Sequence, residues 1–105
     1  MSVPDVYTLL VQVGRKSGDE LAEGASGAAL LCYAEGVDEE EAVRETVAVL
    51  KAADLAPLDV TGYGTLEERL AAGHEVSQWE RALMEKAQVD NAVVVAETAP
   101  FFGEA

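Results

Sequence analysis

The side chain best suited to acid and base chemistry in this sequence is His74. It is the only histidine among 105 residues, and histidine is the side chain whose ordinary pKa lies closest to neutral pH. We therefore take His74 as the candidate general acid or base. No serine, cysteine or second histidine lies at a spacing from it that would complete a catalytic motif. The alternative is an ordinary exposed loop histidine that follows Gly73.

Three aromatic side chains join His74 in a candidate ligand site. Tyr63 ends an expected strand where a helix capped by Thr65 begins, and α/β sheets commonly gather ligands at such positions, beside the N–H groups of the helix. The site that we predict there is lined by Tyr33, Tyr63, His74 and Trp79. For each aromatic residue the alternative is ordinary packing in the core.

The acidic run from Asp38 to Glu41 is the other group with ligand-binding chemistry. Calcium loops alternate their oxygen ligands with a turn glycine, whereas neighbours on a helix point in different directions. Helix capping explains the run better, with Asp38 accepting from the N–H of Glu41 and Glu41 reaching back to the N–H of Asp38. Acidic residues are also favoured at a helix N-terminus. We expect a helix here and no metal site.

The overall charge restricts the partners. Twenty acidic residues against seven basic ones give a formal net charge of −13, which repels phosphate backbones and anionic membrane surfaces. We therefore expect neither nucleic acid nor a membrane as a partner, whereas a basic protein remains compatible. No cofactor is expected from any motif.

The expected location is the cytoplasm. Cys32 is the only cysteine, so an internal disulfide and a cysteine-based zinc site are both excluded, and a reducing compartment fits. The N-terminal residues lack a basic stretch followed by an apolar one, and no apolar run approaches the ~20 residues of a spanning helix.

Hydrophobic periodicity and capping signals place the secondary structure within a single domain, residues 1–105. Thr65 with Glu68, and Ser77 with Glu80, form capping boxes. The helix after Asp38 is expected to bury Val43, Val47 and Leu50. The expected strands are 6–13, 28–35, 58–63 and 92–96, and the last of them is expected in the interior of the sheet. The expected helices are about 39–53, 65–72 and 77–89. Residues 14–26 are expected to form a hairpin loop and residues 99–105 a C-terminal tail.

This order predicts an α+β fold. A hairpin followed by two right-handed crossovers would place the helices on one face of a four-stranded sheet, in a two-layer α/β sandwich of order β-β-α-β-α-β. The spacing resembles that of small ferredoxin-like domains, with the loop 14–26 standing where that family has its first helix. The resemblance concerns architecture and implies no activity.

A one-sided sheet would leave a large apolar face uncovered, which is unusual on a monomer. We therefore expect a homodimer that packs sheet to sheet. The alternative is that the C-terminal tail folds back over its own sheet. The expected interface residues are Tyr7, Leu9, Val11, Leu31, Phe101 and Phe102.

The sequence leaves three functions open. The first is a non-catalytic homodimeric binding or interaction module that recognises a basic protein. The second is a small cofactor-free dimeric enzyme, resembling the oxygenases and isomerases built on ferredoxin-like dimers, in which His74 shuttles a proton and Tyr33 or Tyr63 orients the substrate. An enclosed apolar cavity that reaches His74 would favour this enzyme over the binding module. The third is a nucleic-acid mimic, which needs outward carboxylates spaced like phosphates.

Overall fold

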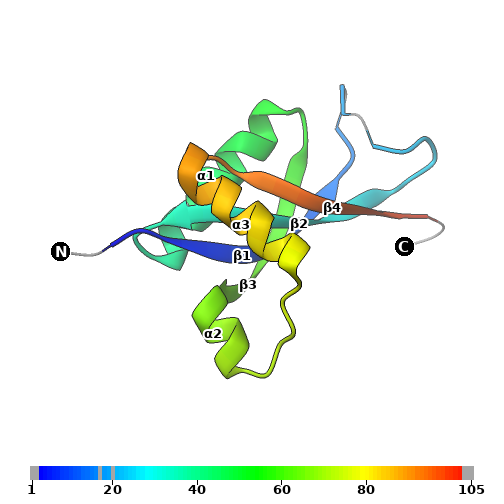
Figure 1. Cartoon of the computed structure of the whole chain (residues 1–105). Helices are drawn as coiled ribbons and strands as arrows, with labels where there is room; N and C mark the ends of the chain where they lie inside the picture. The colour runs from blue at the N-terminus through cyan, green and yellow to red at the C-terminus, as the bar shows by residue number, and fades with distance from the viewer. Residues whose placement is uncertain (1–2, 17, 20, 103–105) are drawn as a thin grey trace.

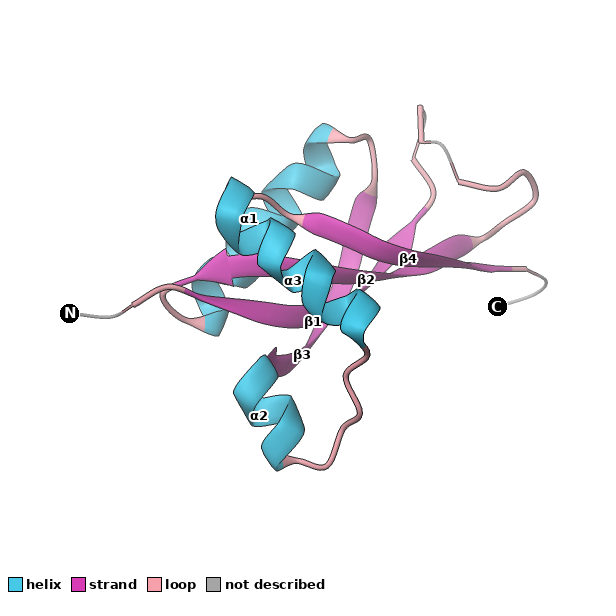
Figure 2. Cartoon of the chain, viewed as in Figure 1, coloured by secondary structure: helices cyan, strands magenta, loops and turns pink. Residues whose placement is uncertain are grey.

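Four antiparallel strands form one sheet, which three helices accompany (Figure 1, Figure 2). The computed structural model describes residues 3–16, 18–19 and 21–102. The strands are β1 (Asp5–Gly14), β2 (Gly27–Gly36), β3 (Ala56–Thr65) and β4 (Val94–Phe101); the helices are α1 (Glu39–Ala52), α2 (Leu66–Ala71) and α3 (Gln78–Asp90). The predicted α+β class is confirmed.

Local capping chemistry starts all three helices where the sequence predicts. The carboxylate of Asp38 accepts from the N–H of Glu41 at 2.8 Å. The return bond differs by one residue, because the Glu41 carboxylate accepts from the N–H of Val37 at 3.1 Å. The capping boxes at Thr65 and Ser77 are complete in both directions.

The strand order does not confirm the ferredoxin-like arrangement. The order is β3-β1-β2-β4, with every neighbouring pair antiparallel. β1 lies between β2 and β3, so the connection through α1 is a crossover between parallel strands. The connection from β3 to β4 instead joins the two antiparallel edges of the sheet. β4 is therefore an edge strand, which corrects the predicted interior position.

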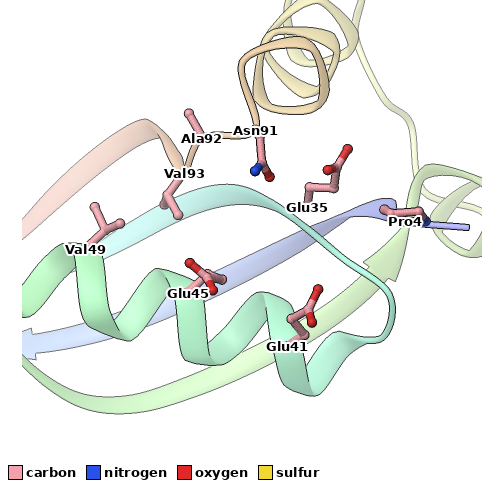
Figure 3. Close-up of a pocket in the computed structure, with 8 residues that line it drawn as sticks. All are labelled: Pro4, Glu35, Glu41, Glu45, Val49, Asn91, Ala92 and Val93. Carbon is pink, nitrogen blue, oxygen red and sulfur yellow. The ribbon is translucent and has the colours of Figure 1, made fainter.

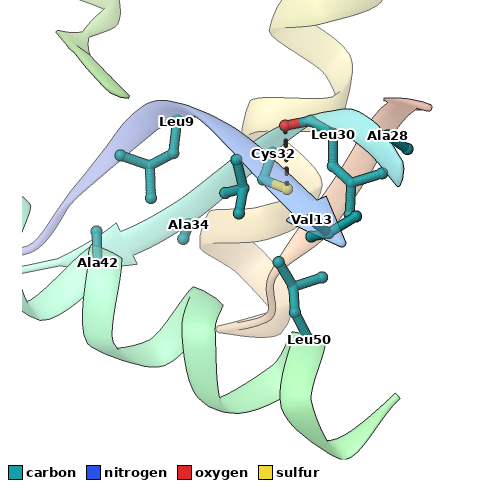
Figure 4. Close-up of a cluster of buried hydrophobic side chains, with 9 residues drawn as sticks. Leu9, Val13, Ala28, Leu30, Cys32, Ala34, Ala42 and Leu50 are labelled. Carbon is teal, nitrogen blue, oxygen red and sulfur yellow. Dashed lines mark hydrogen bonds between the residues drawn. The ribbon is translucent and has the colours of Figure 1, made fainter. Parts of the chain in front are cut away.

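Helices cover both faces of the sheet, so the prediction of helices on one face was wrong. On one face, Leu9, Val11 and Leu30 pack with Ala42 and Leu50 of α1 (Figure 4). On the other face, Val6 and Tyr33 pack with Met84 and Ala87 of α3. We call these the α1 face and the α3 face. The rule that crossovers are right-handed applies to connections between parallel strands. β3 and β4 are antiparallel, so the rule does not fix the face on which α3 lies.

α3 covers only part of its face. β2 and β4 continue to the right of α3 in Figure 2, where no helix lies over them. Residues paired across antiparallel strands share a face, so the pairs Leu10↔Leu31, Ala29↔Ala99 and Gly27↔Phe101 place the exposed surface. We define the open half-face as Leu10, Ala29, Leu31, Ala99 and Phe101.

The predicted C-terminal tail needs a correction at its start. Residues 99 to 101 belong to β4, because Ala99, Pro100 and Phe101 pair with Ala29, Ala28 and Gly27. Residues 103 to 105 of the predicted tail lie outside the described part of the chain. Residues 15–26 join β1 to β2, with 17 and 20 likewise outside it.

Among the described residues, no helix is long and apolar enough to cross a membrane.

Candidate functional site

The structure separates the four residues of the predicted ligand site. Tyr63 and His74 lie together at the sheet margin, with ring centroids 6.3 Å apart in an edge-on arrangement. Both are exposed. Tyr33 is fully buried on the α3 face, and Trp79, at the start of α3, leaves 53% of its surface exposed. The four side chains therefore do not line one pocket as predicted.

Tyr33 instead belongs to a buried polar cluster that connects α2 and α3 to the sheet. Its hydroxyl donates to Glu80 Oε1 at 2.6 Å. Arg69 Nη1 donates to the same oxygen and to Thr8 Oγ1, each at 3.2 Å. The side chains of Arg69 and Glu80 are only 11% and 16% exposed. We call these four residues the polar cluster.

The ionisation states of the polar cluster are fixed by its own contacts. Burial tends to raise the pKa of Glu80, but hydrogen bonds from Tyr33 and Arg69 outweigh it and lower that pKa. Burial, followed by the bond to Glu80, raises the pKa of Tyr33. Glu80 is therefore ionised and Tyr33 protonated around neutral pH. The arrangement suits a structural connection between elements better than proton transfer.

Cys32 is likewise unsuited to chemistry. It is fully buried on the α1 face, and burial raises the pKa of its thiol to about 11. The reactive thiolate is therefore scarce around neutral pH.

The structure contains a groove that the sequence analysis did not predict (Figure 3). Its cavity volume is about 560 Å³. It lies between α1 and the segment that joins α3 to β4. We call it the acidic groove; its lining residues are Pro4, Glu35, Glu41, Glu45, Val49, Asn91, Ala92 and Val93.

Helical spacing explains one wall of the acidic groove. Glu41, Glu45 and Val49 stand four residues apart on α1 and so share one stripe of that helix. Asn91 ends α3 in the left-handed conformation and turns the chain into the opposite wall. Val93 of that wall packs against the α1 core, which holds the two walls in place.

The electrostatics of the acidic groove favour a cation. None of its lining residues is basic, and no ion pair of the described residues involves Glu35, Glu41 or Glu45. The C-terminal end of α3 adds partial negative charge, and its last turn carries no basic residue. Within the described ranges, no group of three or more His, Cys, Asp or Glu side chains could hold a metal ion.

A second, smaller groove of about 180 Å³ lies beside α3 and includes Val6, Leu66, Arg81, Met84 and Gln88 in its lining. His74 lines neither groove.

Two of the predicted interface residues are core residues. Leu9 and Val11 are fully buried beneath α1, so a second copy cannot reach them. Tyr7 packs partly buried against the α1 core and Leu31 against the α3 cluster. Phe101 and Phe102 remain 43% and 61% exposed.

The chain is thus an α+β domain with helices on both faces of an antiparallel sheet and an acidic groove that runs along α1 beside the C-terminal end of α3. It belongs to the family described as "Domain of unknown function (DUF8846)", whose model matches residues 6–102. No curated protein and no solved structure matches the chain.

Proposed function

We propose that this protein is a non-catalytic binding module that holds a positively charged segment of a partner protein in the acidic groove. The observation that carries the proposal is the groove itself, which gathers Glu35, Glu41 and Glu45 without a basic neighbour in its lining.

The chemistry of the lining fits lysine and arginine side chains. Their aliphatic stems pack on apolar surface while their charged heads reach polar groups, and Val49 and Val93 supply such surface beside the carboxylates. Bonds between a cationic donor and a carboxylate are stronger than neutral ones. The net charge of −13 also draws basic partners in and keeps anionic ones away.

Peptide binding at several salt concentrations tests this function. The probe is a short fluorescent peptide in which lysine alternates with valine, followed by fluorescence anisotropy. We expect its affinity to fall about tenfold between roughly 50 mM and 300 mM salt, because salt screens charges that are partly exposed. A peptide with glutamate in place of lysine is the matched control. Equal binding of the two peptides, or affinity independent of salt, would contradict the proposal.

We further propose that the module is a homodimer in which two copies pack through the open half-face. Leu10, Ala29 and Leu31 are partly exposed there, Phe101 is a further member, and Phe102 is the exposed residue that follows it. Besides Glu35 of the groove, the acidic residues paired onto this side of the sheet are Asp59 and Glu97. A second copy therefore buries apolar side chains while most of the acidic surface stays in water.

Sedimentation velocity tests the dimer. Salt screens the repulsion between two copies of charge −13, so dimerisation is expected to strengthen as salt rises, opposite to peptide binding. Replacing Phe101 and Phe102 with serine is expected to weaken association about tenfold or more. A monomer at high micromolar concentration in high salt would contradict this prediction.

The enzyme alternative is less well supported by the described residues. It requires an enclosed apolar cavity that reaches His74, whereas His74 is exposed and lines neither groove described above. The proposed location is the cytoplasm, which the single free cysteine supports.

A further inference from the structure

α3 carries a second stripe of residues on the side that does not pack on the sheet. Its sheet side is formed by Leu83, Met84 and Ala87. Four further residues stand three, four and three positions apart, a spacing that keeps them on one side of a helix. All four are exposed, Trp79 to 53% and Val89 to 75%. We call them the α3 stripe: Trp79, Ala82, Lys86 and Val89.

The α3 stripe lies toward the open half-face. Arg81 and Gln88, on the other side of α3, line the smaller groove together with Val6 of β1. Because β1 and β4 flank β2 on opposite sides, the stripe is on the side of α3 that faces β4. Figure 2 shows β4 and the uncovered end of β2 continuing beside α3. α3 therefore forms a ridge, and the open half-face forms a shelf next to it.

From this arrangement we propose that, in the homodimer, the α3 stripe of each copy packs onto the open half-face of the other. The inference rests on the proposed dimer and specifies which surfaces meet. A twofold axis brings the same patch of both copies together, so each ridge covers the shelf of the other copy. The two α3 helices then lie side by side between the two sheets.

The two surfaces match in length and supply enough area. From its first to its last residue the α3 stripe rises about 15 Å, and β4 extends about 13 Å from Glu97 to Phe101. The exposed parts of Trp79, Phe101 and Phe102 together present roughly 300 Å² of aromatic surface. A standard interface buries about 800 Å² on each partner. These three side chains therefore supply more than a third of it, and the aliphatic residues beside them extend the contact.

Charge also favours a second copy as the occupant. Lys86 is the basic residue of the α3 stripe, and Glu97 pairs with Leu31 on the side of the sheet that bears the open half-face. No ion pair of the described residues involves either Lys86 or Glu97. In the proposed packing Lys86 reaches Glu97 of the other copy, and the twofold axis repeats the pair.

Trp79 reports this packing directly, because it is the only tryptophan of the chain. In a dilution series at roughly 300 mM salt, where repulsion between the copies is screened, its fluorescence emission should move to shorter wavelength as sedimentation shows the dimer forming. Trp79→Ala is expected to weaken dimerisation about thirtyfold, since each dimer loses two aromatic anchors. Leu70→Ala is the matched control, because Leu70 is an exposed helical residue outside both surfaces. Its effect should stay within about twofold.

Charge reversal tests the pairing of the two surfaces. Lys86→Glu is expected to weaken dimerisation about tenfold, and adding Glu97→Lys should recover most of the loss, because the pair forms again with opposite polarity. Lys51→Glu changes the net charge by the same amount on an exposed position of α1. This control should weaken dimerisation less than threefold.

The other outcomes overturn the inference in distinguishable ways. If a dimer forms while the emission of Trp79 stays constant and Trp79→Ala has no effect, the packing of the α3 stripe is wrong and the proposed dimer stands. If the protein is a monomer at high micromolar concentration, both are wrong. If Trp79→Ala weakens the dimer but serine at Phe101 and Phe102 does not, α3 packs on a surface other than the open half-face and the inference fails.

Discussion

Replacing Glu80 with alanine is expected to lower the free energy of unfolding by about 3 kcal/mol, because removal of one partner leaves a buried charge without compensation. Arg69, only 11% exposed, would lose its carboxylate, and the buried hydroxyl of Tyr33 would lose its acceptor. Loss of the return bond to the N–H of Ser77 adds to the effect. Urea denaturation monitored by circular dichroism measures the change.

Glu85→Ala is the matched control, because Glu85 lies on the same helix with an exposed side chain. Its effect should stay within about 0.5 kcal/mol. The lowered pKa of Glu80 means that its stabilising contribution is present above its ordinary pKa and is lost as pH falls through the folded value. The deficit of the alanine variant should therefore shrink below about pH 4. Equal effects of the two substitutions would show that the polar cluster does not connect the helices to the sheet.

The second large effect is expected at the acidic groove. Changing Glu35, Glu41 and Glu45 together to glutamine should weaken binding of the lysine–valine peptide about thirtyfold at low salt, since each lost charge pair contributes somewhat under 1 kcal/mol. Glutamine preserves size and can still accept the hydrogen bond from Val37 that Glu41 now accepts. Fluorescence anisotropy and a parallel unfolding curve separate lost affinity from lost structure.

A control variant with glutamine at Glu23, Glu67 and Glu75 removes the same amount of charge. These side chains are exposed and lie outside the groove lining. Its affinity for the peptide should change by less than about threefold, through the weaker long-range field alone. If the control loses as much affinity as the groove variant, general attraction to an acidic molecule explains the binding and the groove is not the site.

The parts of the fold that follow from neighbouring residues were predictable. Asp38, Thr65 and Ser77 mark helix starts because a cap depends on side chains within a few residues. The buried stripe of α1 was nearly right, since Leu50 is fully buried. The structure centres the stripe on Ala42 and Thr46, with Val43 and Val47 half-buried at its flanks.

The arrangement of the sheet depends on pairings between distant residues and was only partly predictable. β1 is covered on both faces, with Leu9 under α1 and Val6 under α3. The error came from applying the rule for parallel crossovers to the β3 to β4 connection. Those two strands are antiparallel edges of the sheet.

The acidic groove illustrates the same limit for function. The four-residue spacing of Glu41, Glu45 and Val49 is visible in the sequence and identifies one face of α1. The opposite wall comes from residues 91–93, and only the folded chain brings it close. Helix capping and the helix dipole already explain why an acidic residue stands at Glu41. The sequence near Glu41 therefore did not indicate a binding role.

The most direct test of the groove as a binding site is an NMR titration of isotope-labelled protein with the lysine–valine peptide. The account predicts that the largest chemical-shift changes fall on the backbone amides of Glu35, Glu41, Glu45 and residues 91–93, with small changes at Asp59 and Glu97, which lie outside the groove lining. Changes of similar size spread over all acidic surfaces, or concentrated on the open half-face, would contradict it.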